Sequence, residues 1–256
     1  MDDVFSIDNA KALLGRLVLP QAMLGGTAPE IEFESAKNQA LLVGSDVLSF
    51  DQGVESEFRE AVSDTALLAQ LAATHQLGQD PDPIAYFDAY FAIVGSLGWA
   101  TQVRDTAQYE LKTQGAEVHE AIIEVAMAFL KGIPGAAELV VLSLKSLRNM
   151  NQGSPLITLF ERNSQDAKMG RFQFTIVRQD ALGGGLFAEV MAFGLTAREI
   201  ITQVLFFKLK SGSSTLRRSL GRMSLNRPAL QALHPILRAK VATHLAGNVA
   251  ALDIGD

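Results

Sequence analysis

Four short apolar or alternating runs follow one another between Pro155 and Lys210, and they constrain the fold more than any other part of the chain. Polar or glycine-rich residues separate the runs, and two long amphipathic helical patterns precede them. Helices followed by a series of strands are typical of an antiparallel sheet with helices packed on it. The predicted strands are residues 156–160, 172–177, 186–193 and 204–209.

We therefore expect an α+β fold, with an antiparallel sheet of at least four strands flanked by helical layers. The chain has 256 residues, 48% of them hydrophobic and 20% charged, which is enough for a sizeable core. We expect a single domain, residues 1–256, in three parts. Residues 1–115 are mostly helical, residues 116–225 hold a helix pair and the sheet, and residues 226–256 hold a C-terminal helix.

Helical spacing of apolar residues predicts helices at 7–19, 55–77, 84–112 (with breaks at Gly95 and Gly98 as an alternative), 117–131, 136–150 and 228–245. Asp82 is a suitable N-cap, and Pro83 suits the first helical turn. Residues 30–34 alternate like a short strand, and residues 35–48 fit a helix or a strand. Residues 183–185 are all glycine, as a hairpin turn with positive φ requires.

Aromatic residues gather in the helical pattern that begins at residue 84, and we expect them to form a buried face. They are Tyr86, Phe87, Tyr90, Phe91 and Trp99.

Charge is distributed unevenly along the chain. Residues 1–100 hold 4 Lys/Arg and 15 Asp/Glu, a net charge of −11, whereas residues 101–256 hold 18 and 13, a net charge of +5. The basic segment from Lys208 to Lys240 has eight Lys/Arg and no acidic residue. It favours an anionic partner, either phospholipid headgroups or the acidic half of the same chain. Nucleic acid is not expected as a partner, because the segment has no aromatic residue and the whole chain is acidic.

No motif in the sequence indicates catalysis. Cysteine is absent, which excludes disulfides, thiolate nucleophiles and thioester-linked lipids. His119 and Glu120 begin like a zinc-protease helix, but the position of the second histidine is Ile123. Glu117, Glu120 and Glu124 adjoin an apolar stripe and are expected to face water. No nucleophile elbow, Walker A loop or dinucleotide fingerprint is present. We expect no enzyme activity, cofactor, metal or small-molecule substrate.

No segment of the sequence predicts a membrane-spanning helix or a secretory signal. The N-terminus is acidic where a signal peptide would be basic. The longest uncharged run, residues 89–103, has 15 residues, whereas a spanning helix needs about 20. We expect a soluble protein that is secreted or released without a conventional signal peptide.

The order of features from residue 118 to residue 225 is similar to that of a known family. These features are the helix at 118–125, then residues 149–152, 156–161, 172–176, 184–187, 190–195 and 203–209. They resemble the cytolytic delta-endotoxins, the Cyt-type toxins of insecticidal bacteria, and residues 203–209 are similar to that family's penultimate strand. The resemblance covers about 110 of the 256 residues. The first 115 residues are longer and more helical than in that family, and the helix after Pro228 has no counterpart there.

A weaker similarity links the chain to a bacterial gut-virulence factor family whose members carry an acylated cysteine. That lipid is not expected here because the chain has no cysteine. Both resemblances imply a bacterial protein that acts on host membranes without enzymatic chemistry. The implied function is that of a membrane-active toxin or virulence protein, cytolytic and pore-forming, with self-association on the membrane as a further expectation.

Under this hypothesis, anionic headgroups attract basic side chains while the helices at 117–131 and 136–150 move off the sheet. The predicted membrane-binding residues are Lys208, Lys210, Arg217, Arg218, Arg222, Phe172, Phe174, Phe206 and Phe207. The alternative is a non-lytic binding or structural protein with the same scaffold. In that case the basic segment docks on the acidic part of the chain or on a partner protein.

Overall fold

The computed structural model describes residues 5–22, 29–78, 81–110, 115–150, 154–180 and 184–255. Its helices are α1 (Ile7–Arg16), α2 (Ser56–Leu77), α3 (Pro83–Ser96), α4 (Val118–Phe129), α5 (Ala136–Asn149), α6 (Pro155–Ser164) and α7 (Arg227–Val241), with 3₁₀ turns η1 (Val204–Phe206) and η2 (Ala242–Gly247). Its strands are β1 (Gln39–Val43), β2 (Asp46–Phe50), β3 (Trp99–Gln108), β4 (Gln165–Asp166), β5 (Met169–Gln179), β6 (Leu186–Ala197), β7 (Ser214–Leu225) and β8 (Val249–Leu252).

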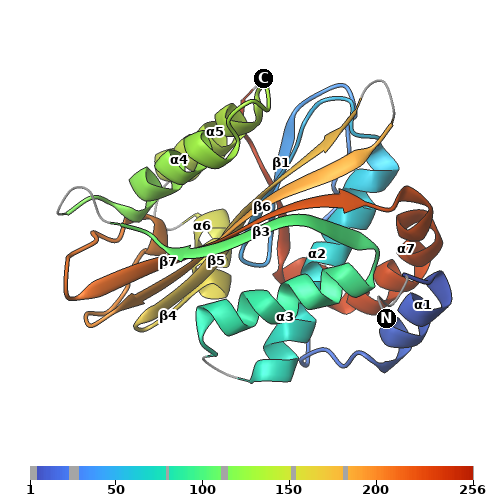
Figure 1. Ribbon diagram of the computed structural model, residues 1–256, viewed down its shortest axis with the longest axis horizontal. Coiled ribbons are helices and arrows are strands. Elements are labelled where there is room, and N and C mark those ends of the chain that lie inside the picture. Colours follow the sequence, from blue (N-terminus) through green and yellow to red (C-terminus); the bar gives the residue numbers. More distant parts are fainter. Residues whose placement is uncertain are drawn as a thin grey trace.

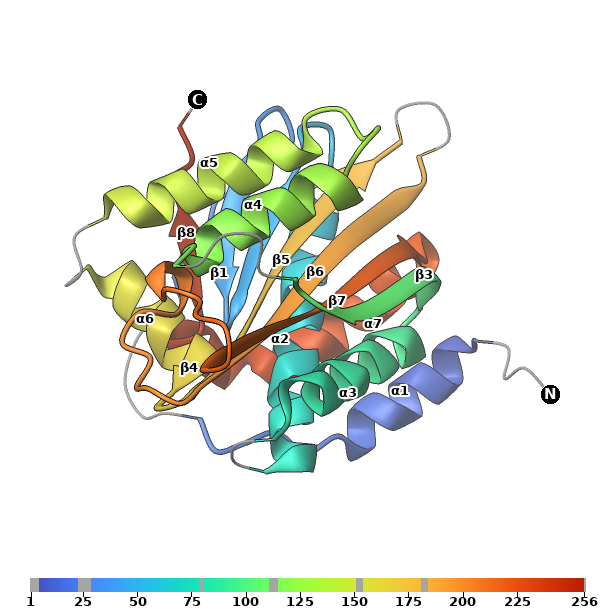
Figure 2. The same ribbon diagram turned by 60° about the vertical axis from the view of Figure 1, so that its left-hand side comes forward.

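One sheet runs through the middle of the molecule, with helices on both faces (Figure 1 and Figure 2). Its strand order is β3-β7-β6-β5-β2-β1-β8, and β4 pairs with the start of β5. Neighbouring strands are antiparallel except for β2 and β5, which are parallel. The α+β class, with an antiparallel sheet of at least four strands between helical layers, is therefore confirmed.

The predicted helices α1, α2, α4, α5 and α7 are confirmed, with ends that differ by a few residues. The predicted cap at Asp82 is also confirmed, because its Oδ2 accepts hydrogen bonds from the backbone N–H groups of Ile84 and Ala85 at 3.0 and 3.1 Å. The expected aromatic face is buried: Tyr86, Phe87, Tyr90, Phe91 and Trp99 are at most 4% exposed.

The predicted strand at 156–160 is wrong, since these residues belong to α6. Ser154 is the N-cap and accepts a hydrogen bond from the backbone N–H of Ile157, and Pro155 occupies the first turn. These two start signals favour a helix over the apolar run that follows. Ile157 and Phe160, three residues apart, then bury one face of that helix.

The predicted strand at 204–209 is also wrong. Residues 204–206 form the turn η1, and Lys208 makes a single β-bridge with Glu117. The last long strand of the sheet is instead β7, which lies within the basic segment Lys208–Lys240 and was not predicted as a strand. Arginines interrupt the alternation of apolar and polar residues in β7. In the structure, Leu216 and Leu220 point to one side of the sheet, and Met223 and Leu225 point to the other.

The helix predicted over 84–112 ends at Ser96, and β3 follows it. Gly98 has φ +97°, a conformation that side chains other than glycine rarely adopt, and it turns the chain from helix into strand. Residues 35–48 contain β1 and the start of β2, whereas residues 30–34 form no strand.

In the predicted glycine turn, Gly184 has φ +63°, as expected. Gly183 lies outside the described residues, as do Lys112 at the end of the predicted helix and Asn151 and Gln152 of the resemblance.

Each face of the sheet has its own core. Helices α1, α2, α3 and α7 pack on one face, and α4, α5, α6 and η1 pack on the other. Strand β5 shows the division, because Phe172, Phe174 and Ile176 point to the second group of helices while Gln173 and Thr175 point to the first.

A buried carboxyl group lies in the core beneath α3. Asp46, at the start of β2, is 0% exposed, and its Oδ2 accepts hydrogen bonds from Gln173 Nε2 at 2.7 Å and Thr175 Oγ1 at 2.8 Å. Burial raises the pKa of Asp46 from 3.8 to about 7, although these hydrogen bonds oppose the shift. The folded protein therefore holds the proton more tightly than the unfolded chain does.

We predict that Asp46 makes the fold less stable as the pH rises. Its favourable contribution is complete below its unfolded pKa of 3.8 and is lost as the pH rises through about 7. The Asp46→Asn variant lacks this loss, so above pH 7 it should exceed the parent protein in free energy of unfolding by on the order of 4 kcal/mol. Urea unfolding across the pH range measures the difference. Parallel pH profiles for the two proteins would contradict the prediction.

Candidate functional site

Helices α4 and α5 form a hairpin that lies over one face of the sheet (Figure 2). Helix α4 contacts η1 and α5, and α5 contacts β2 and β5. The sheet face beneath them is apolar and fully buried. Its side chains from β5, β6 and β7 are Phe172, Phe174, Ile176, Met191, Phe193, Leu195, Leu216 and Leu220. Helix α6 and turn η1 share in covering this face, and the ring centres of Phe160 on α6 and Phe172 lie 6.5 Å apart.

The sequence determines where this hairpin begins and turns. Helix α4 starts with a capping box, in which Glu117 and Glu120 each accept a hydrogen bond from the other's backbone N–H. The predicted apolar stripe of α4 is buried against the sheet. Glycines with positive φ follow α4 and precede α5, at Gly132 (φ +86°) and Gly135 (φ +73°).

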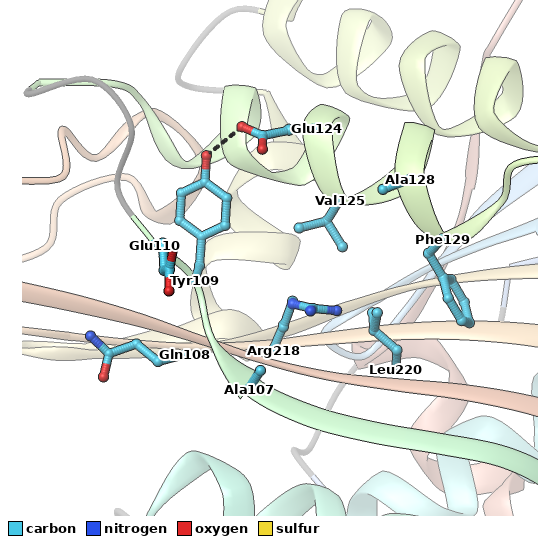
Figure 3. Close-up of a pocket in the computed structure, with 10 residues that line it drawn as sticks. All are labelled: Ala107, Gln108, Tyr109, Glu110, Glu124, Val125, Ala128, Phe129, Arg218 and Leu220. Atoms are coloured by element: carbon cyan, nitrogen blue, oxygen red, sulfur yellow. Dashed lines mark hydrogen bonds between the residues drawn. The ribbon is translucent and has the colours of Figure 1, made fainter.

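Polar contacts fasten the hairpin to the sheet at separate points. The hydroxyl of Tyr109 donates to Glu124 Oε2 at 2.8 Å, across a pocket of about 490 Å³ between α4 and the edge of the sheet (Figure 3). The hydroxyl oxygens of Ser49 on β2 and Ser143 on α5 lie 3.3 Å apart in the buried interface. Each contact joins a residue of the hairpin to a residue outside it.

A third fastening holds the C-terminal end of α4. Arg222 on β7 donates from Nη2 to the backbone carbonyl of Phe129 at 2.5 Å, and its guanidinium lies 5.0 Å from the centre of the Phe129 ring. A cation at this position also interacts favourably with the negative end of the helix dipole.

Beneath this end of α4 lies a buried acidic residue. Glu189 on β6 is 2% exposed and lies opposite Arg222 in the strand register. Its Oε1 accepts hydrogen bonds from Arg178 Nε and Nη2 at 3.2 and 3.0 Å. Burial raises the pKa of Glu189, and the charges of Arg178 and Arg222 oppose that shift. The two arginines thus compensate a carboxylate that would otherwise be costly to bury.

The four predicted membrane-binding phenylalanines all lie beneath or beside the hairpin. Phe172 and Phe174 are fully buried, and Phe206 and Phe207 are partly buried. The ring centres of Phe206 and His119 on α4 are 5.6 Å apart. The carbonyl of Phe207 accepts the backbone N–H of Val118 at 3.0 Å. Phe172 also packs against Phe160 of α6, with ring centres 6.5 Å apart, so α4 is not the sole cover of these rings.

The predicted basic residues are not gathered in one patch. Arg218 and Arg222 face α4, whereas Arg217 lies on the opposite face of the same strand. Most of them contact acidic residues: Lys210–Glu199 at 2.9 Å, Arg217–Asp82 at 3.4 Å and Arg218–Asp105 at 3.2 Å. Lys208 is exposed and makes no ion pair within the described residues.

The three glutamates at the start and on the surface of α4 were expected to face water, and this is only partly correct. Glu120 is exposed, but Glu117 and Glu124 are partly buried. Sequence reasoning also missed Tyr109, Arg178 and Glu189. A carboxylate within the apolar run at 186–193 was the one available signal for a buried charge.

Within the described ranges, no group of three or more His, Asp or Glu residues is placed to hold a metal ion. Among the helices that the structure describes, none combines the length and the apolar character needed to cross a membrane.

Comparisons with known proteins give fold neighbours but no sequence family. No family profile matches the chain, and neither does any curated protein. A solved delta-endotoxin structure has 15% identity and a TM-score of 0.40, covering 84% of this chain and 96% of its own. The activated Cyt2Ba monomer from Bacillus thuringiensis subsp. israelensis has 16% identity and a TM-score of 0.40, covering 71% and 97%. The Evf virulence factor has 12% identity and a TM-score of 0.37, covering 96% and 92%.

Two of these neighbours are delta-endotoxins, and the third is a virulence factor. With TM-scores of 0.40 or less, these likenesses carry no argument about function. The function is therefore argued from the residues of this chain.

We predict that Arg222 stabilises the covered sheet and that its neighbour Arg218 does not. Arg222→Met removes a bond to Phe129 and one cation beside Glu189, which should lower the free energy of unfolding by about 2 kcal/mol. Arg218→Met, four residues away on the same face, removes only an ion pair to the exposed Asp105 and should cost under about 1 kcal/mol. Urea unfolding measures both variants, and equal losses would refute the assigned role of Arg222.

Proposed function

We propose that this protein is a membrane-active toxin or virulence protein that binds and perturbs host membranes without enzymatic chemistry. The hairpin of α4 and α5 is its removable cover. The observation that carries the proposal is that residues 118–149, consecutive in the chain, bury part of an apolar sheet face that they share with α6 and η1. A displacement of this one segment uncovers the part beneath it, while α6 and η1 stay on that face and α1, α2, α3 and α7 stay on the other.

The energetics explain why the cover stays closed in water. Burying a large apolar side chain contributes about 1.5–3 kcal/mol, so exposing the phenylalanines and aliphatic side chains under the hairpin costs on the order of 10 kcal/mol. A bilayer removes this cost because its hydrocarbon core accepts the apolar side chains. The opening is therefore coupled to membrane contact.

Under this proposal, Lys208, Lys210, Arg217, Arg218 and Arg222 attract anionic headgroups. Lys208 is the first of them to act, because its side chain is exposed and has no acidic partner in the described structure. Phe206 and Phe207 directly precede it and lie beside the start of α4, so binding at Lys208 places the edge of the cover near the lipid. Release from the producing cell and action on host membranes follow from the same proposal.

Ion pairs within the chain support the second candidate, a non-lytic scaffold whose basic segment docks on acidic residues. Arg217 contacts Asp82, Arg227 contacts Glu55 at 2.8 Å, and Arg238 contacts Asp64 at 3.1 Å. In this alternative the cations already have their partners, and the protein does not bind lipid. The two experiments below separate the candidates.

We predict that a covalent tether between α5 and the sheet blocks vesicle leakage. Ser49→Cys with Ser143→Cys places two thiols where hydroxyl oxygens lie 3.3 Å apart. The natural chain has no cysteine, so these two thiols can pair only with each other within one molecule. The oxidised variant should release no dye from anionic vesicles, and reduction should restore release.

The matched control is Thr106→Cys with Ser219→Cys, whose hydroxyl oxygens lie 3.0 Å apart between β3 and β7. That disulfide does not join the hairpin to the sheet, so leakage by the oxidised monomer should equal leakage by the reduced protein. Leakage by the oxidised Ser49–Ser143 tether, or no leakage by the natural protein, would refute the proposal.

We predict that Lys208→Glu weakens binding to anionic vesicles without changing stability. One cation near a charged leaflet contributes about 1 kcal/mol, so reversing it should weaken binding roughly tenfold or more. Lys11→Glu, at an exposed position on α1, changes the net charge equally and should leave binding unchanged. Vesicle co-sedimentation and thermal unfolding measure the two effects. Equal losses of binding in both variants would mean that net charge, not Lys208, attracts the lipid.

A further inference from the structure

The long edge of the sheet is open along β3. This strand ends the strand order, and within the ranges given above it pairs with β7 alone. Residues 100–106 are all exposed, and Val103 is 49% exposed. The opposite edge is β8, which has only four residues. Figure 1 shows β3 in front, with α3 below it and α4 above.

The usual protections of an edge strand are nearly absent from β3. Natural edges are blocked by lysine, proline, bulges, unpaired charges or short length. Strand β3 has ten residues, with neither lysine nor proline, and one irregularity between Thr101 and Val103. Its two central charged side chains form ion pairs within the same molecule, Arg104 with Asp88 and Asp105 with Arg218. Neither side chain is free to block an approaching strand.

The backbone register identifies the groups that face the open edge. The N–H of Tyr109 donates to the carbonyl of Leu216 at 2.8 Å, continuing the register from Gln108 opposite Arg217. Residues of an antiparallel pair bond to their neighbour at alternate positions. Peptide groups at 103, 105, 107 and 109 therefore face β7, and those at 104, 106 and 108 face the open edge.

We propose that β3 pairs with β3 of a second copy of this chain, antiparallel and centred on Thr106. A two-fold axis perpendicular to the sheet places one residue opposite its own copy. A centre at Arg104 or Asp105 would oppose like charges, which is destabilising. A centre at Val103 would include the irregularity, and a centre at Ala107 would place Arg104 opposite Glu110, past Tyr109, whose N–H still bonds to β7.

The register centred on Thr106 opposes no like charges. Arg104 lies opposite Gln108 of the second copy, and Asp105 lies opposite Ala107. Val103 lies opposite Tyr109, a β-branched and aromatic pair of the kind that stabilises sheets. The pocket between α4 and β3, lined by Ala107 and Tyr109, leaves space on that face for added side chains (Figure 3).

A second copy fits this edge better than the other occupants that the chain itself offers. The β8 edge is too short to match β3 and would give an open, non-closing assembly. A β3–β3 contact closes on itself, so it forms a dimer. A strand pair of this length is a small interface, and we expect a weak, concentration-dependent dimer. The dimer does not depend on the membrane proposal, because it requires no lipid.

Two substitutions of Gln108 test the register, because they should change the dimer dissociation constant in opposite directions. Gln108→Glu places a carboxylate opposite Arg104 of the other copy at two symmetric positions, and Gln108→Arg places a like charge there. The dimer dissociation constant should fall roughly two- to thirtyfold for Gln108→Glu and rise by a similar factor for Gln108→Arg. Sedimentation equilibrium of the full chain without lipid measures all three proteins. A strict monomer, or two substitutions with the same effect, would overturn the proposal.

Single cysteines give a second readout, since the chain has none of its own. In the proposed dimer, Thr106→Cys places two Cα atoms about 5.5 Å apart, within the span of a disulfide. The two copies of Gln102→Cys would lie about 26 Å apart. Oxidation should therefore crosslink the Thr106→Cys variant much faster than the Gln102→Cys variant. Equal crosslinking rates would contradict the pairing.

Discussion

The apolar face formed by β5, β6 and β7 must be kept from water, and the hairpin of α4 and α5 covers it together with α6 and η1. Phe172, Phe174 and Phe193 on this face are 0% exposed. The hairpin is held by packing and by a few polar contacts, chiefly those of Tyr109 and Arg222. Packing dominates the energy, because each net hydrogen bond contributes only about 1 kcal/mol whereas the apolar face contributes on the order of ten times more.

The other face of the sheet is fastened differently. Helices α2 and α7 are joined by ion pairs, in which Arg238 and His234 both approach Asp64, at 3.1 and 3.4 Å. The hydrogen bond to Asp64 raises the pKa of His234, and the buried Asp46 lies in the core of the same face. Both groups hold a proton more tightly in the folded state, so each stabilises the fold below its unfolded pKa and loses that contribution as the pH rises through its folded pKa. The ion pairs between α2 and α7 involve no residue of the hairpin, so we regard this layer as the one that stays in place when the hairpin moves.

Local patterns predicted the helices well because their signals lie close together in the sequence. The cap at Asp82 and the apolar stripe of α4 are examples. The strands were predicted less well. Strand β7 carries three arginines and four serine or threonine residues among its apolar ones, and its cations find partners such as Asp105 and Phe129 that are distant in sequence. The contact between Tyr109 and Glu124, and the open edge of β3, depend on tertiary packing and on strand order, which no local pattern specifies.

The central claim is that one segment leaves the sheet while the rest of the fold remains. Hydrogen exchange of the vesicle-bound protein, resolved by mass spectrometry, tests it most directly. The account predicts that amides of residues 118–149 exchange faster on the membrane than in solution, while those of α2 and α7 keep their protection. Unchanged protection at 118–149, or an equal loss of protection in α2 and α7, would contradict it.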